Sequence, residues 1–132
     1  MSATVYISIY KPSDERDPNH WAIYIQNGQE GVILQVADDK GGIGYYVDKP
    51  IYNKQPQRSQ RHETSIPVGT IKSENYEAAV AAIQATPVDN ESTTWNCQAW
   101  AMEALDALEE AELFVWDQKG KAQAKARRQE WQ

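Results

Sequence analysis

The stretch from Cys97 to Ala111 has the most regular pattern in this 132-residue chain, and it constrains the fold to include one long helix. Apolar residues recur there at three- and four-residue intervals with acidic residues between them, which predicts an amphipathic helix. The apolar set consists of Cys97, Trp100, Ala101, Ala104, Leu105, Leu108 and Ala111. Asn96 or Thr94 can cap this helix, so Cys97 lies in its first turn and on its inward face.

The first 48 residues favour strands. Residues 4–10, 20–26 and 32–37 are rich in β-branched and aromatic side chains, and Asn27-Gly28 offers the backbone freedom of a tight turn. We therefore expect a strand at 4–10 and a hairpin between 20–26 and 32–37. A second turn at residues 38–42 leads to a fourth strand at 43–48.

Residues 49–63 are polar and contain two prolines, which indicates an exposed connection of the kind that overhangs binding sites. Residues 64–72 favour a further strand, at an edge or irregular, because Pro67 removes a backbone donor. A second helix is expected over 74–85, capped by Ser73, with Tyr76, Ala79, Val80 and Ile83 on one face.

These elements predict an α+β fold, with an antiparallel sheet of about five strands and two helices packed on it. Residues 1–116 form one domain in this interpretation. Residues 117–132 are basic and are expected to be a helical or disordered tail. This tail is either solvated or in contact with the acidic face at residues 103–112.

Composition excludes several classes of function. A net charge of −6 argues against a nucleic-acid partner. The absence of a signal-peptide pattern and of an apolar run of about 18 residues predicts a soluble, cytoplasmic protein without a membrane span. One cysteine and two histidines fall short of a zinc set, and no cofactor motif is present, so we expect neither metal nor cofactor.

Cys97 is the candidate nucleophile. A thiolate is favoured at a helix N-terminus, where unpaired N–H groups and the helix dipole stabilise negative charge. The base would be His20 or His62. His20 is the better candidate, because it opens a strand, whereas His62 lies in a polar segment.

Strand alternation places His20, Ala22 and Tyr24 on one face of the second strand. Ala22 is small enough to let the cysteine helix approach that face. On the third strand Gln35 is a polar residue within an apolar run. It either bonds His20 on the neighbouring strand or faces solvent, and the sequence leaves both readings open.

A resemblance follows from these residues. A strand opening with His20-Trp21-Ala22 and a helix opening with Asn96-Cys97-Gln98 resemble the circularly permuted branch of the papain-like NlpC/P60 superfamily, whose familiar members are lecithin:retinol acyltransferase-like proteins. The motif Trp-Asn-Cys-Gln-x-Trp at residues 95–100 is also similar to that of small proteins from filamentous fungi. The resemblance spans about residues 5–113.

The resemblance implies a permuted papain-like order, in which the histidine strand precedes the cysteine helix. It implies Cys97 as nucleophile and His20 as base. Gln35 stands where relatives often have histidine, and it would accept a hydrogen bond from the Nδ1–H of His20. The substrate-binding candidates are Trp95, Tyr24, Asn96 and Gln98, whereas Trp100 is expected in the core.

The function implied is a cysteine-dependent hydrolase or acyltransferase that acts on an amide, ester or thioester of a small molecule or peptide. Two alternatives stay open. One is a tailoring enzyme of fungal secondary metabolism on the same scaffold, and the other is a non-catalytic binding module. The sequence does not indicate an oligomeric state.

Overall fold

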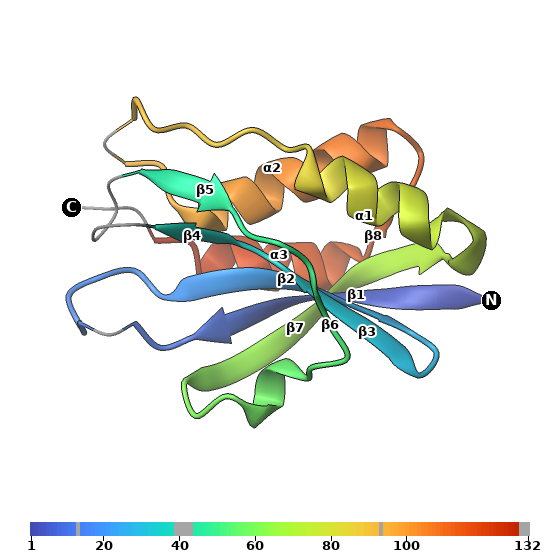
Figure 1. The fold of residues 1–132 in the computed structure, drawn as a ribbon, viewed down its shortest axis with the longest axis horizontal. Helices are drawn as coiled ribbons and strands as arrows, with labels where there is room; N and C mark the ends of the chain where they lie inside the picture. The colour runs from blue at the N-terminus through green and yellow to red at the C-terminus, as the bar shows by residue number, and fades with distance from the viewer. Residues whose placement is uncertain (13, 39–43, 93, 130–132) are drawn as a thin grey trace.

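A computed structural model describes residues 1–12, 14–38, 44–92 and 94–129 of the chain (Figure 1). The described residues form an α+β fold. One sheet has six strands in the order β6-β3-β2-β1-β7-β8, a second has the two strands β4 and β5, and every strand pairing is antiparallel. The sheet thus has one strand more than expected, and three helices replace the expected two.

The first three strands are β1 (Ser2–Tyr10), β2 (His20–Asn27) and β3 (Glu30–Leu34). Asn27 pairs with Glu30 across a turn in which Gly28 has a φ of +63°, so the predicted hairpin is confirmed. The third strand was expected to continue to residue 37, but β3 ends at Leu34. β4 (Val36–Asp38) then pairs with β5 (Tyr45–Val47) in the separate small sheet. Most of the turn expected at 38–42 falls outside the described residues.

The remaining strands are β6 (Ile51–Tyr52), β7 (His62–Lys72) and β8 (Val115–Trp116), with the short 3₁₀ helix η1 (Pro56–Arg58) between β6 and β7. The irregular strand expected around Pro67 is confirmed, because the β1–β7 register shifts between Val5 and Tyr6, next to Pro67. It is not the edge strand, since β8 pairs with Gly69 and Thr70 on its other side.

The helices are η2 (Ser73–Asn75, a 3₁₀ turn), α1 (Tyr76–Gln84), α2 (Cys97–Glu110) and α3 (Gln118–Ala126). The predicted buried face of α1 is confirmed. The cap predicted at Ser73 is wrong, because α1 begins three residues later. The Ser73 hydroxyl instead donates to the side chain of Asn27 (2.9 Å).

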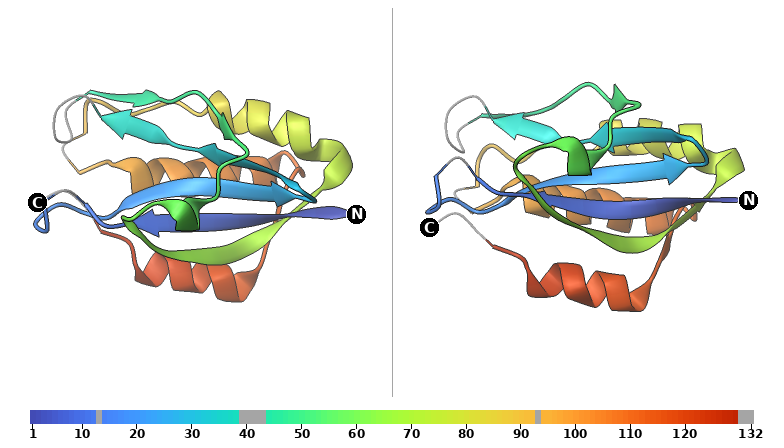
Figure 2. Two further views of the ribbon diagram at one scale, coloured as in Figure 1. Left: turned by 60° about the horizontal axis from the view of Figure 1, so that its bottom comes forward. Right: turned by 90° about the horizontal axis from the view of Figure 1, so that it is seen from below.

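Helices α1 and α2 cover one face of the large sheet (Figure 2). Ile7, Ile23 and Ile25 on that face are buried against Trp100 and Leu105 of α2. The opposite face, called here the open face, carries a smaller apolar cluster of Ala22, Tyr24 and Ile33 with Tyr6, Tyr10 and Ile51 at its rim. Burial of the larger cluster supplies most of the hydrophobic stabilisation, because that term scales with the apolar area removed from water.

Helix α3 lies along β7 (Figure 2), so the expectation of a solvated or frayed tail is not met over residues 118–126. Gly120 permits this packing, because a Cβ there would lie 2.1 Å from the carbonyl oxygen of Pro67. Ala124 is fully buried in the main core. The alternative expectation was that the tail contacts the acidic face at residues 103–112. One such contact is present, because Lys121 Nζ lies 3.8 Å from Asp106 Oδ1.

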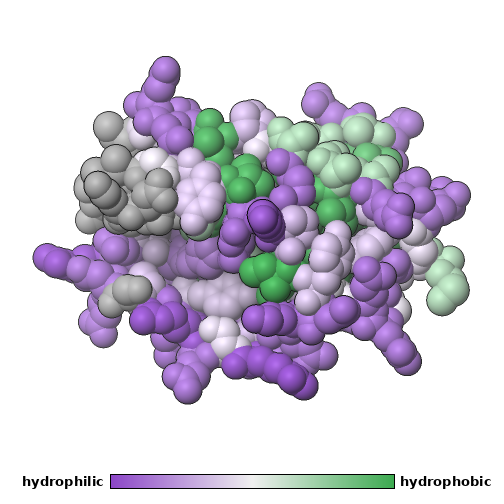
Figure 3. All heavy atoms as spheres, viewed as in Figure 1, coloured by the Kyte–Doolittle hydropathy of each residue, from purple (hydrophilic) through white to green (hydrophobic). Residues whose placement is uncertain are grey.

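The surface seen in Figure 3 is mainly hydrophilic, with hydrophobic residues in small separate patches. Among the described helices none combines the length and apolar character needed to cross a membrane.

Candidate functional site

The start of α2 is fixed by its cap. Asn96 has an extended backbone (φ −149°), and its side-chain oxygen accepts the N–H groups of Gln98 (3.0 Å) and Ala99 (3.2 Å). Cys97 is therefore the first helical residue, in the first turn as predicted, and the residue is 7% exposed. The Cys97 N–H has no hydrogen-bond acceptor among the described residues, so it remains available at the positive end of the helix.

The thiol of Cys97 meets the beginning of β2. The Trp21 N–H donates to Cys97 Sγ (3.4 Å), and the carbonyl oxygen of Asn19 lies 3.8 Å from the same sulfur. Strand pairing explains this contact: Trp21 pairs with Ile9 of β1 on one side, but β2 and β3 pair only as far as Ile23 and Leu34, so no strand pairs with Trp21 on its other side. The sulfur thus contacts the backbone on both sides of His20.

This arrangement corrects one expectation. The face of β2 that packs on α2 carries Trp21, Ile23 and Ile25, whereas Ala22 and Tyr24 lie on the open face. The small size of Ala22 therefore does not admit the helix. Cys97 instead reaches the strand at its end, where the main chain is accessible because β3 has turned away.

The His20 ring is bonded to Gln35. His20 Nε2 lies 2.7 Å from Gln35 Oε1, and Gln35 Nε2 donates to Asp48 Oδ2 at 3.5 Å. The carboxylate of Asp48 can only accept, so the Gln35 amide turns its NH₂ to Asp48 and its oxygen to His20. His20 Nε2 must then carry the proton. The predicted His20–Gln35 bond is confirmed, but the nitrogen is Nε2 and not the predicted Nδ1.

Asp48 was not predicted as part of the site. Its backbone N–H donates to the carbonyl of Gln35 (3.0 Å), its own carbonyl accepts from Gln84 Nε2 (2.9 Å), and Oδ1 accepts the Lys49 N–H (2.9 Å). These contacts hold the carboxylate behind Gln35. The only signal in the sequence was an acidic residue at the end of a predicted strand.

Cys97, Asn96, His20 and Gln35 line one cavity of about 550 Å³. The three predicted catalytic residues and one predicted substrate-binding residue thus line the same cavity. This volume is within the range of about 300–1,000 Å³ in which proteins hold small molecules.

The other walls of this cavity come from segments far apart in the chain. The apolar side chains are those of Ile33, Ile51 and Tyr45, and charged residues are contributed by Lys11, Asp17 and Arg61. Ile51 and Arg61 belong to the connection at 49–63, which was expected to overhang a site. The Lys11 N–H donates to the Arg61 carbonyl (2.7 Å), which joins this connection to the end of β1.

Tyr10 is a further cavity residue that the sequence did not indicate. Its ring centroid lies 5.5 Å from that of His20, with the planes tilted by 45°. Burial raises the pKa of Tyr10 to about 12. Tyr10 thus packs beside His20 as a neutral phenol across the physiological pH range.

Of the four predicted substrate-binding residues, only Asn96 lines the cavity. Trp95 is 8% exposed, packs edge-on against Tyr45 and donates from Nε1 to Glu103 (3.0 Å). Tyr24 belongs to the open-face cluster and donates to Gln26. Gln98 is fully buried. These three side chains therefore have structural partners, and Trp100 is in the core as expected.

No group of three metal-ligating side chains is found within the described ranges. Cys97 is the only cysteine of the chain and is a free thiol. The polar side chains that line the cavity thus include a thiol, an imidazole, two amides, two phenols, the Ser59 hydroxyl and three charged groups.

Comparison with known protein families places the chain in one of them. The model of DUF6540, described as a family of unknown function, matches residues 5–115. No curated protein and no solved structure matches the chain.

Proposed function

We propose that this chain, which belongs to the DUF6540 family, is a cysteine-dependent hydrolase or acyltransferase with the permuted papain-like order of elements. The observation that supports this most is the joint presence, in one cavity, of a thiol at a helix N-terminus and an imidazole whose Nε2 is bonded to Gln35. Such a nucleophile, base and orienting group is the usual arrangement for covalent acyl transfer.

The first step is proton transfer from Cys97 Sγ to His20. Because Nε2 carries the proton bonded to Gln35, Nδ1 is the nitrogen that accepts the thiol proton. The product is a thiolate and an imidazolium. The Trp21 N–H and the N-terminus of α2 stabilise the thiolate, and the Gln35 oxygen, with Asp48 behind it, stabilises the imidazolium.

The thiolate then attacks the carbonyl carbon of an amide, ester or thioester. A carbon–sulfur bond forms, and the carbonyl electron pair moves to the oxygen, which the Cys97 N–H can stabilise. The carbon–heteroatom bond breaks, and His20 returns its proton to the leaving group. Water or a second nucleophile, deprotonated by His20, releases the acyl group and restores the thiol.

The cavity lining suggests the kind of acyl compound. Ile33, Ile51 and Tyr45 provide apolar contacts, while the charged lining residues are two cations, Lys11 and Arg61, and one anion, Asp17. A substrate with an apolar body and an anionic group fits this combination better than a cationic one.

The test uses p-nitrophenyl esters and acyl thioesters, with and without a terminal carboxylate, and reads the intact mass. We expect one acyl group per chain and a matching burst of p-nitrophenol, both lost in Cys97→Ala. The chain has a single cysteine, so a thiol adduct identifies its position. A protein that forms no adduct with any probe, although folded, would be a binding module on this scaffold.

A further inference from the structure

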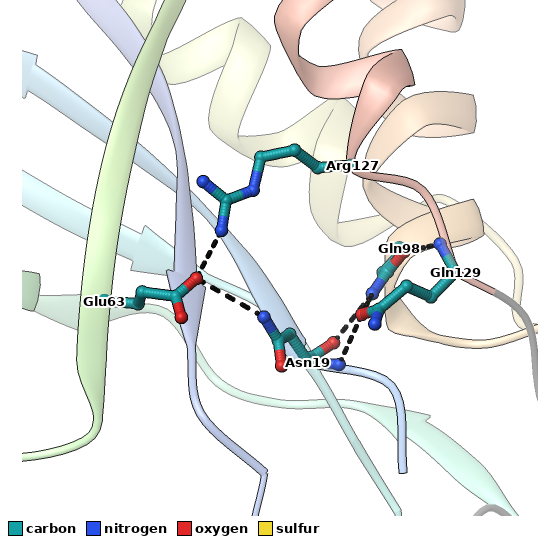
Figure 4. A network of polar contacts seen from close by, with 5 residues as sticks. All are labelled: Asn19, Glu63, Gln98, Arg127 and Gln129. Carbon is teal, nitrogen blue, oxygen red and sulfur yellow. Dashed lines mark hydrogen bonds and ion pairs between the residues drawn. The ribbon is translucent and has the colours of Figure 1, made fainter. Parts of the chain in front are cut away.

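Residues 127–129, which follow α3, are called here the strap. Figure 4 shows Gln129 bonded to Asn19, which precedes His20, and to Gln98, which follows Cys97, and Arg127 bonded to Glu63. We propose that the strap is a positioning element that holds the backbone next to His20 against the start of the cysteine helix. The inference rests on the proposed function, because it concerns the geometry of the Cys97–His20 pair. Gln129 is the positioning residue.

The backbone of Gln129 holds both neighbours of Cys97. Its N–H donates to Gln98 Oε1 (2.6 Å), and its carbonyl accepts from Asn96 Nδ2 (2.9 Å). Gln98 is fully buried and Asn96 is 1% exposed. Buried amide groups need hydrogen-bond partners, so the start of α2 depends on this segment to satisfy them.

The side chain of Gln129 extends the same contacts to β2. Its Oε1 accepts the Asn19 N–H (2.8 Å) and a Gln98 Nε2 hydrogen (3.2 Å), and Gln98 Nε2 also donates to the Asn19 carbonyl (2.9 Å). Asn19 precedes His20, and its carbonyl lies beside Cys97 Sγ. One amide oxygen thus joins the backbone next to the base to the helix that carries the nucleophile.

One further contact joins the strap to β7. Arg127 forms an ion pair with Glu63, and Asn19 Nδ2 donates to the same carboxylate at 3.5 Å (Figure 4). These side chains are partly exposed to solvent, so they contribute less than the buried amides. Because α3 packs on β7, the strap that follows it lies beside Glu63 and Asn19.

The strap lies beyond the part of the chain that matches the family model, which ends at residue 115. The residues that we propose to position the Cys97–His20 pair therefore lie outside the matched region. Substitution of Gln129 should disturb reactivity while the core of the domain stays intact, because Gln129 is itself exposed.

The test compares Gln129→Ala and a deletion of residues 127–132, which leaves α3 in place. Two controls accompany them. Gln129→Glu keeps an oxygen that accepts the same two hydrogen bonds, and Arg128→Ala removes a neighbouring exposed side chain. For each protein we would measure the iodoacetamide alkylation rate of Cys97 between about pH 6 and 9.5 and the thermal unfolding temperature.

We expect Gln129→Ala and the deletion to lower the rate near pH 6.5 by about tenfold or more, and the rate near pH 9.5 by less than about threefold, because ionisation of the thiol and not access would change. Both controls should keep the wild-type profile. Equal loss at both pH values, or lower thermal stability with an unchanged profile, would overturn the inference.

His20→Ala separates this inference from the proposed function. A His20→Ala profile identical to that of the wild type would contradict the Cys97–His20 pair itself. A change in His20→Ala without one in Gln129→Ala would contradict only the role of the strap. If the deletion variant does not fold, the role of the strap is tested by comparing the alkylation profiles of Gln129→Ala and Gln129→Glu.

Discussion

The two histidines of the chain lie on either side of one tyrosine, yet their surroundings differ. The Tyr10 ring centroid is 5.5 Å from that of His20 and 5.7 Å from that of His62. His20 is bonded to the Gln35 amide at the cavity that holds Cys97. His62 Nε2 lies 2.9 Å from the Ser65 hydroxyl, which lies 2.8 Å from the hydroxyl of buried Ser8.

The difference lies in what each partner can do. A hydroxyl rotates and can donate or accept, so Ser65 does not select a tautomer of His62. The Gln35 amide is oriented by Asp48, and it therefore selects the Nε2–H form of His20. His62 lines a separate cavity of about 300 Å³ that does not include Cys97. The ring is the same in both places, but only His20 lines the cavity of Cys97 and is bonded to an oriented amide.

The largest difference is expected between the single variants His20→Ala and His62→Ala. His20→Ala should lower the rate of Cys97 acylation by an ester probe about 100-fold or more, as expected for loss of a general base, whereas His62→Ala should stay within about twofold. The measurement is the burst rate of p-nitrophenol release near pH 7. Equal effects of the two variants would remove the distinction between the histidines.

Gln35→Ala should lower the same rate by about 10- to 100-fold, less than His20→Ala, because the base remains but loses its orientation. The matched control is the double variant Gln35→Glu with Asp48→Asn. The new carboxylate also accepts the Nε2–H and supports the imidazolium, and the amide at position 48 avoids the like charge that Asp48 Oδ2 would present 3.5 Å away. This double variant should keep at least wild-type activity. The idea that Gln35 orients the ring fails if Gln35→Ala and wild type react at the same rate.

Asp48→Asn should have a smaller effect, about two- to fivefold, because its contact with Gln35 is long at 3.5 Å. An asparagine can present either an oxygen or an NH₂ group to Gln35, so the orientation of the amide is less strictly fixed. A loss as large as that in Gln35→Ala would mean that the carboxylate acts more directly than we infer.

Tyr10 should affect stability at high pH. Its folded pKa of about 12 lies above the ordinary value near 10, so the folded state holds the phenol proton more tightly. Its contribution to stability is therefore complete below about pH 10 and is lost as the pH rises from about 10 towards 12.

Tyr10→Phe should accordingly flatten the alkaline decrease in the free energy of unfolding, measured by urea denaturation between about pH 8 and 11. Tyr46→Phe is the control, because Tyr46 is 47% exposed. The effect is small, since Tyr10 is only partly buried. An alkaline decrease as steep in Tyr10→Phe as in the wild type would contradict the raised pKa.

The sequence predicted well what depends on local pattern. The helix from Cys97, its Asn96 cap and the hairpin at Gly28 follow from periodicity and turn chemistry within short segments. Cys97, His20 and Gln35 were each identified, and the structure places all three at one cavity.

What the sequence missed depends on distant partners. Gln98 and Trp95 were expected at the substrate, but their polar atoms are used by Gln129 and Glu103. The packing of α3 was missed because Gly120 and Ala124 form its contact, and periodicity detects bulky apolar residues better than close approach through small ones. The end of β3 at Leu34 likewise follows from the separate β4–β5 pairing, which has no local signature.

The measurement that tests the central claim most directly is the pH dependence of Cys97 alkylation by iodoacetamide in the wild type, His20→Ala and His62→Ala. A Cys97–His20 pair predicts rapid alkylation near pH 6 to 7, where an ordinary thiol with a pKa of about 8.5 is almost entirely protonated. That reactivity should be lost in His20→Ala and kept in His62→Ala. Slow alkylation at this pH in the wild type, unchanged by His20→Ala, would contradict the account.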